Sequence, residues 1–264
     1  MLLQRSIDLG NPVADHPLNR GLVSWYLGLP GRRFGTKFPE VKSNGTSAAL
    51  AGTVTTPWTS GSSPDFQAFR FSNDRTYSIT NLVGNAAYTV AFRYLLTSTP
   101  SYSYLLEDGT GGTARIGFDS GSSTQVITRL VTTKTLYSTA ISGSRGLGRW
   151  NTGILTRQVG APCYWYCNGN RSTIVASGPA GNGNFNRVGG AYLSGYGLRG
   201  ALESVAIYNY AMSDSQALAL TNQYDMGYPD LLRRTSGRFM LVDGGGGGSF
   251  QPAWARGSNV ILGS

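Results

Sequence analysis

The chain is poor in the side chains that enzymes use for acid–base and nucleophilic chemistry. Its 264 residues include one histidine, His16, and three glutamates, Glu40, Glu107 and Glu203. Glycoside hydrolysis needs two carboxyl groups that face each other across the scissile bond. None of these glutamates has another carboxylate two or four residues away on the same strand. A Ser-His-Asp triad would depend on His16, which precedes a proline in the N-terminal segment. The composition therefore predicts no catalytic residues and no enzymatic activity.

Cysteine is almost absent as well. Cys163 and Cys167 lie four residues apart on one expected strand, so both side chains point to the same face, about 13 Å from each other. A disulfide needs Cα atoms within about 7 Å, so we expect two buried free thiols. Two cysteines and one histidine do not form a metal-ligand set, and no glycine-rich segment is followed by Gly-Lys-Ser/Thr. We expect no metal and no cofactor.

Long apolar runs are also missing. No stretch of 18 apolar residues occurs, which excludes a membrane-spanning helix. Asp8 and Asp15 lie where a signal peptide would have its apolar segment. The sequence therefore predicts no signal peptide, no membrane partner and maturation in a cytoplasm.

Carboxylates are absent from the whole stretch Ser120–Leu202, and the net charge of the whole chain is +9. The stretch carries eight basic residues: Arg129, Lys134, Arg145, Arg149, Arg157, Arg171, Arg187 and Arg199. This imbalance favours contact with a negatively charged surface. The alternative is a set of dispersed, solvated strand residues.

The chain is rich in glycine and tyrosine, with 37 and 15 residues. Together with serine and threonine, they are typical of many short strands joined by tight turns. Apolar residues make up 40% of the chain, which is enough for a core at this length. Strand-like segments occur at residues 21–27, 66–72, 77–79, 88–94, 162–169, 185–190 and 201–208.

The segment 201–208 and the residues after it have the most informative pattern. Because side chains alternate along a strand, we expect Glu203, Val205 and Ile207 to share one face, with Glu203 at its rim near Gly200. The segment thus predicts a last strand with one buried face.

A short helix should follow, because Ser213 and Gln216 have the spacing of a capping box in front of an apolar run. A β-rich chain that closes with a strand, a corner and a short helix resembles a laminin-G-like domain of the concanavalin A type. The other strand segments occur in the order of that family, and the resemblance covers residues 19–224. It implies an all-β, concanavalin A-like jelly-roll sandwich of two antiparallel sheets, with one short C-terminal helix and extended terminal arms.

Three parts follow from this resemblance and from composition. Residues 1–18 are expected to form an extended N-terminal arm, residues 19–228 the sandwich, and residues 229–264 a C-terminal arm with a glycine hinge at 244–248. The C-terminal arm is too apolar for an idle tail. We expect it to lie on a surface, either of its own domain or of a neighbouring subunit.

Relatives in this family often bind Ca²⁺ at the rim of the sandwich through carboxylate, amide and backbone oxygens. The matching region here is residues 37–46, where Lys37 and Lys42 flank the single carboxylate of Glu40. The resemblance therefore does not extend a calcium site to this chain.

Aromatic side chains offer two kinds of ligand contact. Tyr102, Tyr104, Tyr192 and Tyr196 lie in expected loops or sheet edges and are candidates for carbohydrate binding, the alternative being half-buried strand tyrosines. Bases could stack on the aromatic residues of 164–166. However, alternation buries either Cys163, Trp165 and Cys167 or the two tyrosines between them, so we expect no specific nucleic-acid partner.

Residues 15–23 also resemble the start of laminin-G-like proteins that occur in phage genomes as virion components. This resemblance implies a non-enzymatic phage virion structural protein, such as a capsid decoration or cement protein, located in the virion. It would dock on capsid or other virion proteins, or on copies of itself, through its arms and a basic face. Candidate contact residues are Arg5, Arg233, Arg234, Phe250, Trp254 and Arg256. The alternative is a carbohydrate-binding adhesin module on a fibre or cell surface, with a glycan as partner.

Overall fold

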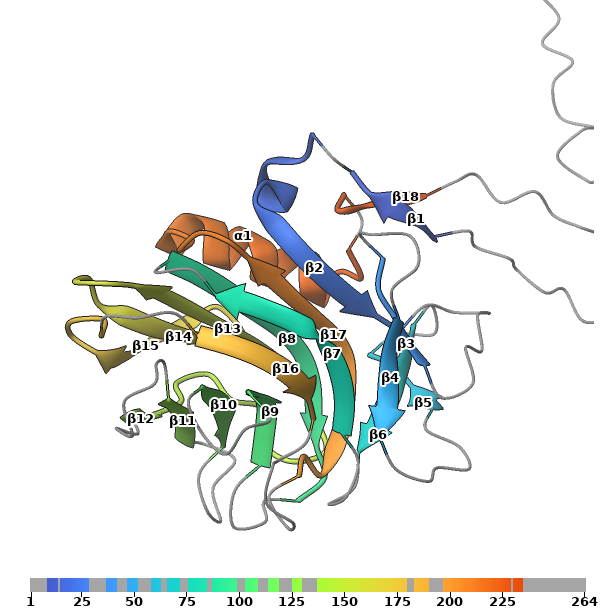
Figure 1. Ribbon diagram of the computed structural model, residues 1–264, viewed down its shortest axis with the longest axis horizontal. Coiled ribbons are helices and arrows are strands. Elements are labelled where there is room, and N and C mark those ends of the chain that lie inside the picture. The colour runs from blue at the N-terminus through green and yellow to red at the C-terminus, as the bar shows by residue number, and fades with distance from the viewer. Residues whose placement is uncertain are drawn as a thin grey trace, which may run out of the picture.

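The computed structural model describes residues 9–13, 15–28, 37–41, 47–51, 58–62, 66–71, 76–84, 87–98, 103–108, 114–118, 125–129, 137–179, 183–189, 197–228 and 230–234. In this part of the chain, two eight-stranded antiparallel sheets form a sandwich with one α-helix outside it (Figure 1). The predicted all-β sandwich with a short C-terminal helix is confirmed. None of the helices within these ranges is long and apolar enough to cross a membrane.

The first sheet has the strand order β12-β11-β10-β9-β16-β7-β4-β3, and each strand is antiparallel to its neighbours. Its strands are β3 (Lys37–Pro39), β4 (Ser47–Ala51), β7 (Thr76–Gly84), β9 (Ser103–Glu107), β10 (Arg115–Phe118), β11 (Gln125–Arg129), β12 (Tyr137–Ala140) and β16 (Gly183–Val188).

The second sheet has the order β15-β14-β13-β8-β17-β6-β5, and β2 pairs with the second half of β17. Its strands are β2 (Leu22–Leu27), β5 (Trp58–Ser60), β6 (Gln67–Phe71), β8 (Ala87–Leu96), β13 (Trp150–Gln158), β14 (Cys163–Cys167), β15 (Asn170–Val175) and β17 (Gly200–Tyr208). Each strand-like segment of the sequence thus contributes to a strand.

Alternation along β14 settles which of its side chains enter the core. Cys163, Trp165 and Cys167 are fully buried between the two sheets, and both cysteines are free thiols, as predicted. Tyr164 and Tyr166 point to the opposite side, where they pack with the apolar cluster beneath the helix. The outer face of β14 therefore offers two tyrosines to whatever lies against it.

A β-bulge places Glu203 differently from its prediction. Along β8, Tyr94 pairs with Leu202 and Arg93 pairs with Ser204, so Glu203 is an extra residue in β17. Val205 and Ile207 face the core between the sheets. Glu203 is fully buried and accepts a hydrogen bond from the hydroxyl of Tyr228, a member of the outer cluster, at 3.0 Å. The expected shared face and rim position were wrong, because the bulge reverses the alternation.

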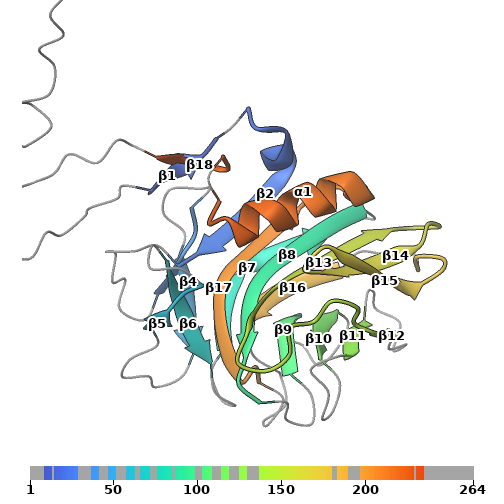
Figure 2. The ribbon, with the colours of Figure 1, turned by 180° about the vertical axis from the view of Figure 1, so that it is seen from behind.

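The helix α1 (Asp214–Asp225) begins as predicted. The Ser213 hydroxyl accepts a hydrogen bond from the backbone N–H of Gln216 at 3.3 Å. In return, the side-chain Oε1 of Gln216 accepts one from the backbone N–H of Ser213 at 3.0 Å. The helix lies along the outer face of the second sheet (Figure 2). Its buried residues Ala217, Leu220 and Tyr224 there join a second apolar cluster with Trp25, Tyr166 and Tyr208.

The two ends of the described chain lie side by side. β1 (Leu9–Pro12) pairs with β18 (Leu232–Arg234) in a separate two-stranded sheet, away from β14 and β15 (Figures 1 and 2). The Asn19 side-chain amide donates to the carbonyls of Val13 and Leu231 at 2.9 and 3.0 Å. Leu231 and Leu232 are buried. The start of the C-terminal segment therefore lies on its own domain. The hinge at 244–248 is outside the described residues.

Candidate functional site

A surface groove lies between the second sheet and the segment that leads into α1. It has a volume of about 420 Å³. One side is formed by β13 and β14, and the other by residues 211–216. Side chains that line the groove include Thr156, Gln158, Tyr164, Met212, Asp214 and Gln216. Small-ligand sites have volumes of about 300–1,000 Å³, so the groove is large enough for a small molecule.

The wall of the groove is held by a fully buried threonine of β8. The Thr89 hydroxyl donates to the carbonyl of Tyr210 at 2.8 Å and accepts the backbone N–H of Met212 at 2.9 Å. These two bonds fix the corner between β17 and α1, and the capping box then fixes the first turn of the helix. As a result Asp214, the first residue of α1, stands over the outer face of β14.

A polar cluster joins this carboxylate to the sheet. The Tyr166 hydroxyl donates to Asp214 Oδ1 at 2.7 Å, and the Arg171 guanidinium donates to Oδ2. Burial raises the pKa of Tyr166, and its hydrogen bond to Asp214 raises the pKa further, so the hydroxyl remains a donor. The guanidinium carbon of Arg171 lies 4.7 Å from the centre of the Tyr164 ring. Asp214 is thus held in a defined position beside an aromatic side chain.

The groove combines the groups that recognise polyhydroxylated ligands. An aromatic ring packs against apolar C–H surface, a carboxylate accepts hydrogen bonds from hydroxyls, and amide and guanidinium groups donate to hydroxyl oxygens. Tyr164, Asp214 and Gln158 line the groove, and Arg171 contacts both Tyr164 and Asp214 beside it.

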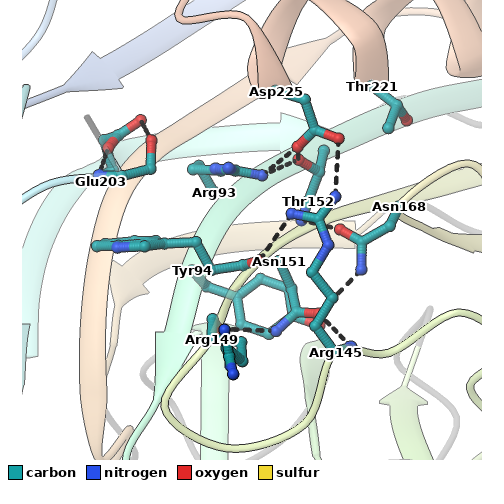
Figure 3. Close-up of polar contacts among 12 residues, drawn as sticks. Arg93, Tyr94, Arg145, Arg149, Asn151, Thr152, Asn168, Glu203, Thr221 and Asp225 are labelled. Atoms are coloured by element: carbon teal, nitrogen blue, oxygen red, sulfur yellow. Dashed lines mark hydrogen bonds and ion pairs between the residues drawn. The ribbon is translucent and has the colours of Figure 1, made fainter.

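A second polar cluster fixes the other end of α1 (Figure 3). Asp225 accepts hydrogen bonds from Arg93 of β8 and from Thr152 of β13, and pairs with Arg145 at 3.1 Å. Beside it, the Asn168 amide donates to Asn151 Oδ1 at 2.9 Å. Two arginines of the carboxylate-free stretch, Arg145 and Arg171, therefore pair with aspartates of α1, which the sequence places after that stretch.

The glutamates are engaged in contacts within the fold. Glu40 accepts the backbone N–H of Trp25 at 3.2 Å, and Glu107 lies 3.4 Å from the guanidinium of Arg115. Glu203 accepts the backbone N–H and the hydroxyl of Ser62 as well as the Tyr228 hydroxyl. Burial raises the pKa of Glu203, and the bonds from Ser62 oppose that shift. Within the described ranges, no three His, Cys, Asp or Glu side chains gather as a metal site would require.

Three of the ten residues predicted for binding are described by the structure, and none of these three lines the groove. Tyr104 is in β9 with 3% of its surface exposed, and Arg115 donates to its hydroxyl at 3.1 Å. The expectation of an exposed aromatic face is therefore wrong for Tyr104, and the alternative of a strand tyrosine holds. Tyr102, Tyr192 and Tyr196 are outside the described residues, as are Arg5, Phe250, Trp254 and Arg256. Arg233 and Arg234 are in β18, away from the groove.

Sequence reasoning did not assign the residues that form the groove. Tyr164 was considered only for base stacking or core packing, Arg171 only as one of eight basic residues in the carboxylate-free stretch, and Asp214 was not considered. One signal was available: if Cys163, Trp165 and Cys167 are buried, alternation turns Tyr164 outward. No local pattern connects Arg171 with Asp214, which lies 43 residues further along the chain.

Comparisons with known proteins agree with the fold. A family model described as the concanavalin A-like lectin/glucanases superfamily matches residues 71–217, which include Tyr164, Arg171 and Asp214. A search of curated protein sequences finds no match.

The solved structures that resemble this chain include domain 4 of AbnA, an extracellular GH43 arabinanase from Geobacillus stearothermophilus, in complex with arabinotriose. The two share 12% identity over 76% of this chain and 98% of that domain, with a TM-score of 0.59.

Two further similar structures are larger than this chain. The binding domain of Paraclostridial Mosquitocidal Protein 1 shares 15% identity over 78% of this chain and 53% of that one, with a TM-score of 0.52. Trypanosoma rangeli sialidase in complex with 2,3-difluorosialic acid shares 17% identity over 78% of this chain and 33% of that one, also with a TM-score of 0.52. The likeness to all three is one of fold.

Proposed function

The chain belongs to the concanavalin A-like lectin/glucanase superfamily, and from this premise we propose that it is a non-catalytic carbohydrate-binding protein. Its ligand would lie in the groove between β13, β14 and the start of α1. The observation that carries the proposal is the position of Tyr164 and Asp214 in one groove of suitable size, with Arg171 in contact with both.

Two further facts support the proposal. AbnA domain 4, which shares this fold, was solved with arabinotriose. The groove wall is also held in place by Thr89 and by the capping box at Ser213. A wall that is already ordered loses little conformational entropy when a ligand binds, which favours affinity.

The test is a glycan array followed by calorimetry on Tyr164→Ala and Tyr164→Phe. We expect the wild type to bind at least one neutral oligosaccharide. Loss of the ring in Tyr164→Ala should weaken binding about two- to tenfold, since aromatic packing contributes about 0.5–1.5 kcal/mol. Tyr164→Phe keeps the ring and should bind nearly as well as the wild type. Absence of binding by the wild type across a broad array would refute the proposal.

The non-catalytic part of the proposal has its own measurement. The protein should release no new reducing ends from the oligosaccharides that it binds, even after long incubation. Turnover that depends on Glu203 or Asp214 would show that the protein is an enzyme.

A second candidate function is that of a structural component of a phage particle, as the resemblance of residues 15–23 implies. The pairing of β1 with β18 favours it, because both terminal segments continue from one place on the domain. Quantitative mass spectrometry of purified particles is the test. Many copies, in a fixed ratio to the main shell protein, would support a decoration role, and absence from particles would exclude it.

A further inference from the structure

The groove has a charge arrangement that bears on which sugars it accepts. We propose that it selects neutral saccharides and that Asp214 determines this selectivity, by offering the ligand only hydrogen-bond acceptors and by holding Arg171 in an ion pair. This inference rests on the proposed carbohydrate-binding function and specifies its ligand class.

The ionised carboxylate of Asp214 can accept further hydrogen bonds but has no proton to donate. Its Oδ1 receives the Tyr166 hydroxyl at 2.7 Å and its Oδ2 receives Arg171. Each carboxylate oxygen has two lone pairs, so one position on each oxygen remains for a ligand. The side chain lines the groove and is 60% exposed, so these positions are open to a ligand. Sugar hydroxyls can donate to them, and an ionised sugar carboxylate cannot.

Two arginines near the groove are engaged by other groups. Arg171 lies against the Tyr164 ring and is paired with Asp214. Arg157 also lines the groove, but it is fully buried. Its guanidinium lies over the ring of Tyr88, in the core between the sheets, and donates to the carbonyl of Pro179. An ionised sugar carboxylate beside Asp214 would place acceptor against acceptor, and a hydrogen bond lost in this way lowers a binding constant about tenfold.

Removing the charge of Asp214 should reverse the preference. In Asp214→Asn, the side-chain oxygen can still accept the Tyr166 hydroxyl, but Arg171 loses its ionic partner. The guanidinium is a planar donor that binds carboxylates through two parallel hydrogen bonds. It would then face the groove from its place on the Tyr164 ring, available to an acidic sugar.

The experiment compares matched sugars on matched variants. The probes are neutral gluco-, galacto- and manno-configured trisaccharides and their counterparts oxidised to carboxylates at C6. Binding of both series is measured by calorimetry for the wild type, for Asp214→Asn and for Asp230→Asn. The last variant removes an exposed carboxylate that bonds to Gln223, at the other end of α1 from the groove. Denaturation curves establish that each variant is folded.

We expect the wild type to prefer neutral probes about tenfold. In Asp214→Asn the ratio of neutral to acidic affinity should fall by at least about tenfold, and in Asp230→Asn it should not change. Equal or stronger wild-type binding of the acidic probes, or an unchanged ratio in Asp214→Asn, would overturn the inference and leave the carbohydrate-binding function standing. Failure of the wild type to bind any glycan would refute the proposed function itself.

Discussion

Arg93 and Asp225 form an ion pair that joins the last residue of α1 to the middle of β8. The Arg93 side chain is 6% exposed, and it also donates to the Thr152 hydroxyl at 2.7 Å. At the other end of the helix, Asp214 is bound by Tyr166 and Arg171. Aspartates at both ends therefore hold α1 against the sheet, and this holds the groove wall in position.

The two ion pairs should contribute very differently to stability. Asp225→Ala leaves the buried Arg93 without a carboxylate and should lower the free energy of unfolding by about 2–4 kcal/mol. Asp214→Asn removes a pair in which the side chains are 47% and 60% exposed, and should cost less than about 1 kcal/mol. Urea denaturation followed by tryptophan fluorescence measures both. Similar losses in the two variants would contradict this assignment.

Glu203 should make stability depend on pH. Because burial raises its pKa above the ordinary value of 4.5, the folded protein holds a proton that the unfolded chain has released. The stability that protonated Glu203 contributes to the folded protein is therefore fully present below pH 4.5. It is lost as the pH rises through the folded-state pKa. Glu203→Gln has no such titration. Urea denaturation from about pH 4 to about pH 8 should show the variant gaining stability relative to the wild type as the pH rises. A constant difference between them would disprove the prediction.

Gly153 of β13 leaves room for the Trp165 ring. A Cβ atom at this position would lie 2.5 Å from the nearest carbon of that ring and 3.0 Å from the Tyr94 ring. Both rings are buried, so Gly153→Ala should destabilise the fold by about 1–3 kcal/mol. Thermal denaturation measures the loss, and near-ultraviolet circular dichroism reports any shift of Trp165. In a double-mutant cycle with Trp165→Phe, the two changes should be non-additive by about 1 kcal/mol. Strict additivity would mean that the contact is not the cause.

The two thiols should be unreactive in the folded protein. Burial raises the pKa of Cys163, and it raises the pKa of Cys167 to about 11. The thiolate is the reactive form, so a thiol reagent at about pH 8 should label neither cysteine before unfolding. Labelling of both in denaturant is the control. Rapid labelling of either thiol in native buffer would show that the core is open at that point.

Local patterns account for two of the correct predictions. The capping box at Ser213 depends on residues three positions apart, and the common face of Cys163 and Cys167, which are buried, depends on strand alternation. Glu203 shows where such reasoning fails. Its face is reversed by a bulge, which depends on how β17 pairs with β8 and cannot be seen in either strand alone.

The groove could not be predicted either, because it is built from residues on different strands and on the helix. Tyr164 was visible as an aromatic residue on a strand, but its partner Arg171 is on the next strand and Asp214 is on the helix. Tyr104, which was expected to be exposed, is buried, and the guanidinium of Arg115 from the neighbouring strand β10 lies over its ring. Exposure of a strand tyrosine thus depends on neighbours that the sequence does not identify.

By itself, the sequence determined the strand segments and the start of the helix, and its resemblance to a known family indicated the kind of fold. The strand segments and the helix start follow from side-chain alternation and hydrogen bonds within a few residues, so a linear sequence contains them. Only the tertiary structure decided the bulge at Glu203, the pairing of α1 aspartates with distant arginines, and the groove around Tyr164. Those features depend on strand register and on where the helix lies on the sheet, which bring together residues that are far apart in the chain.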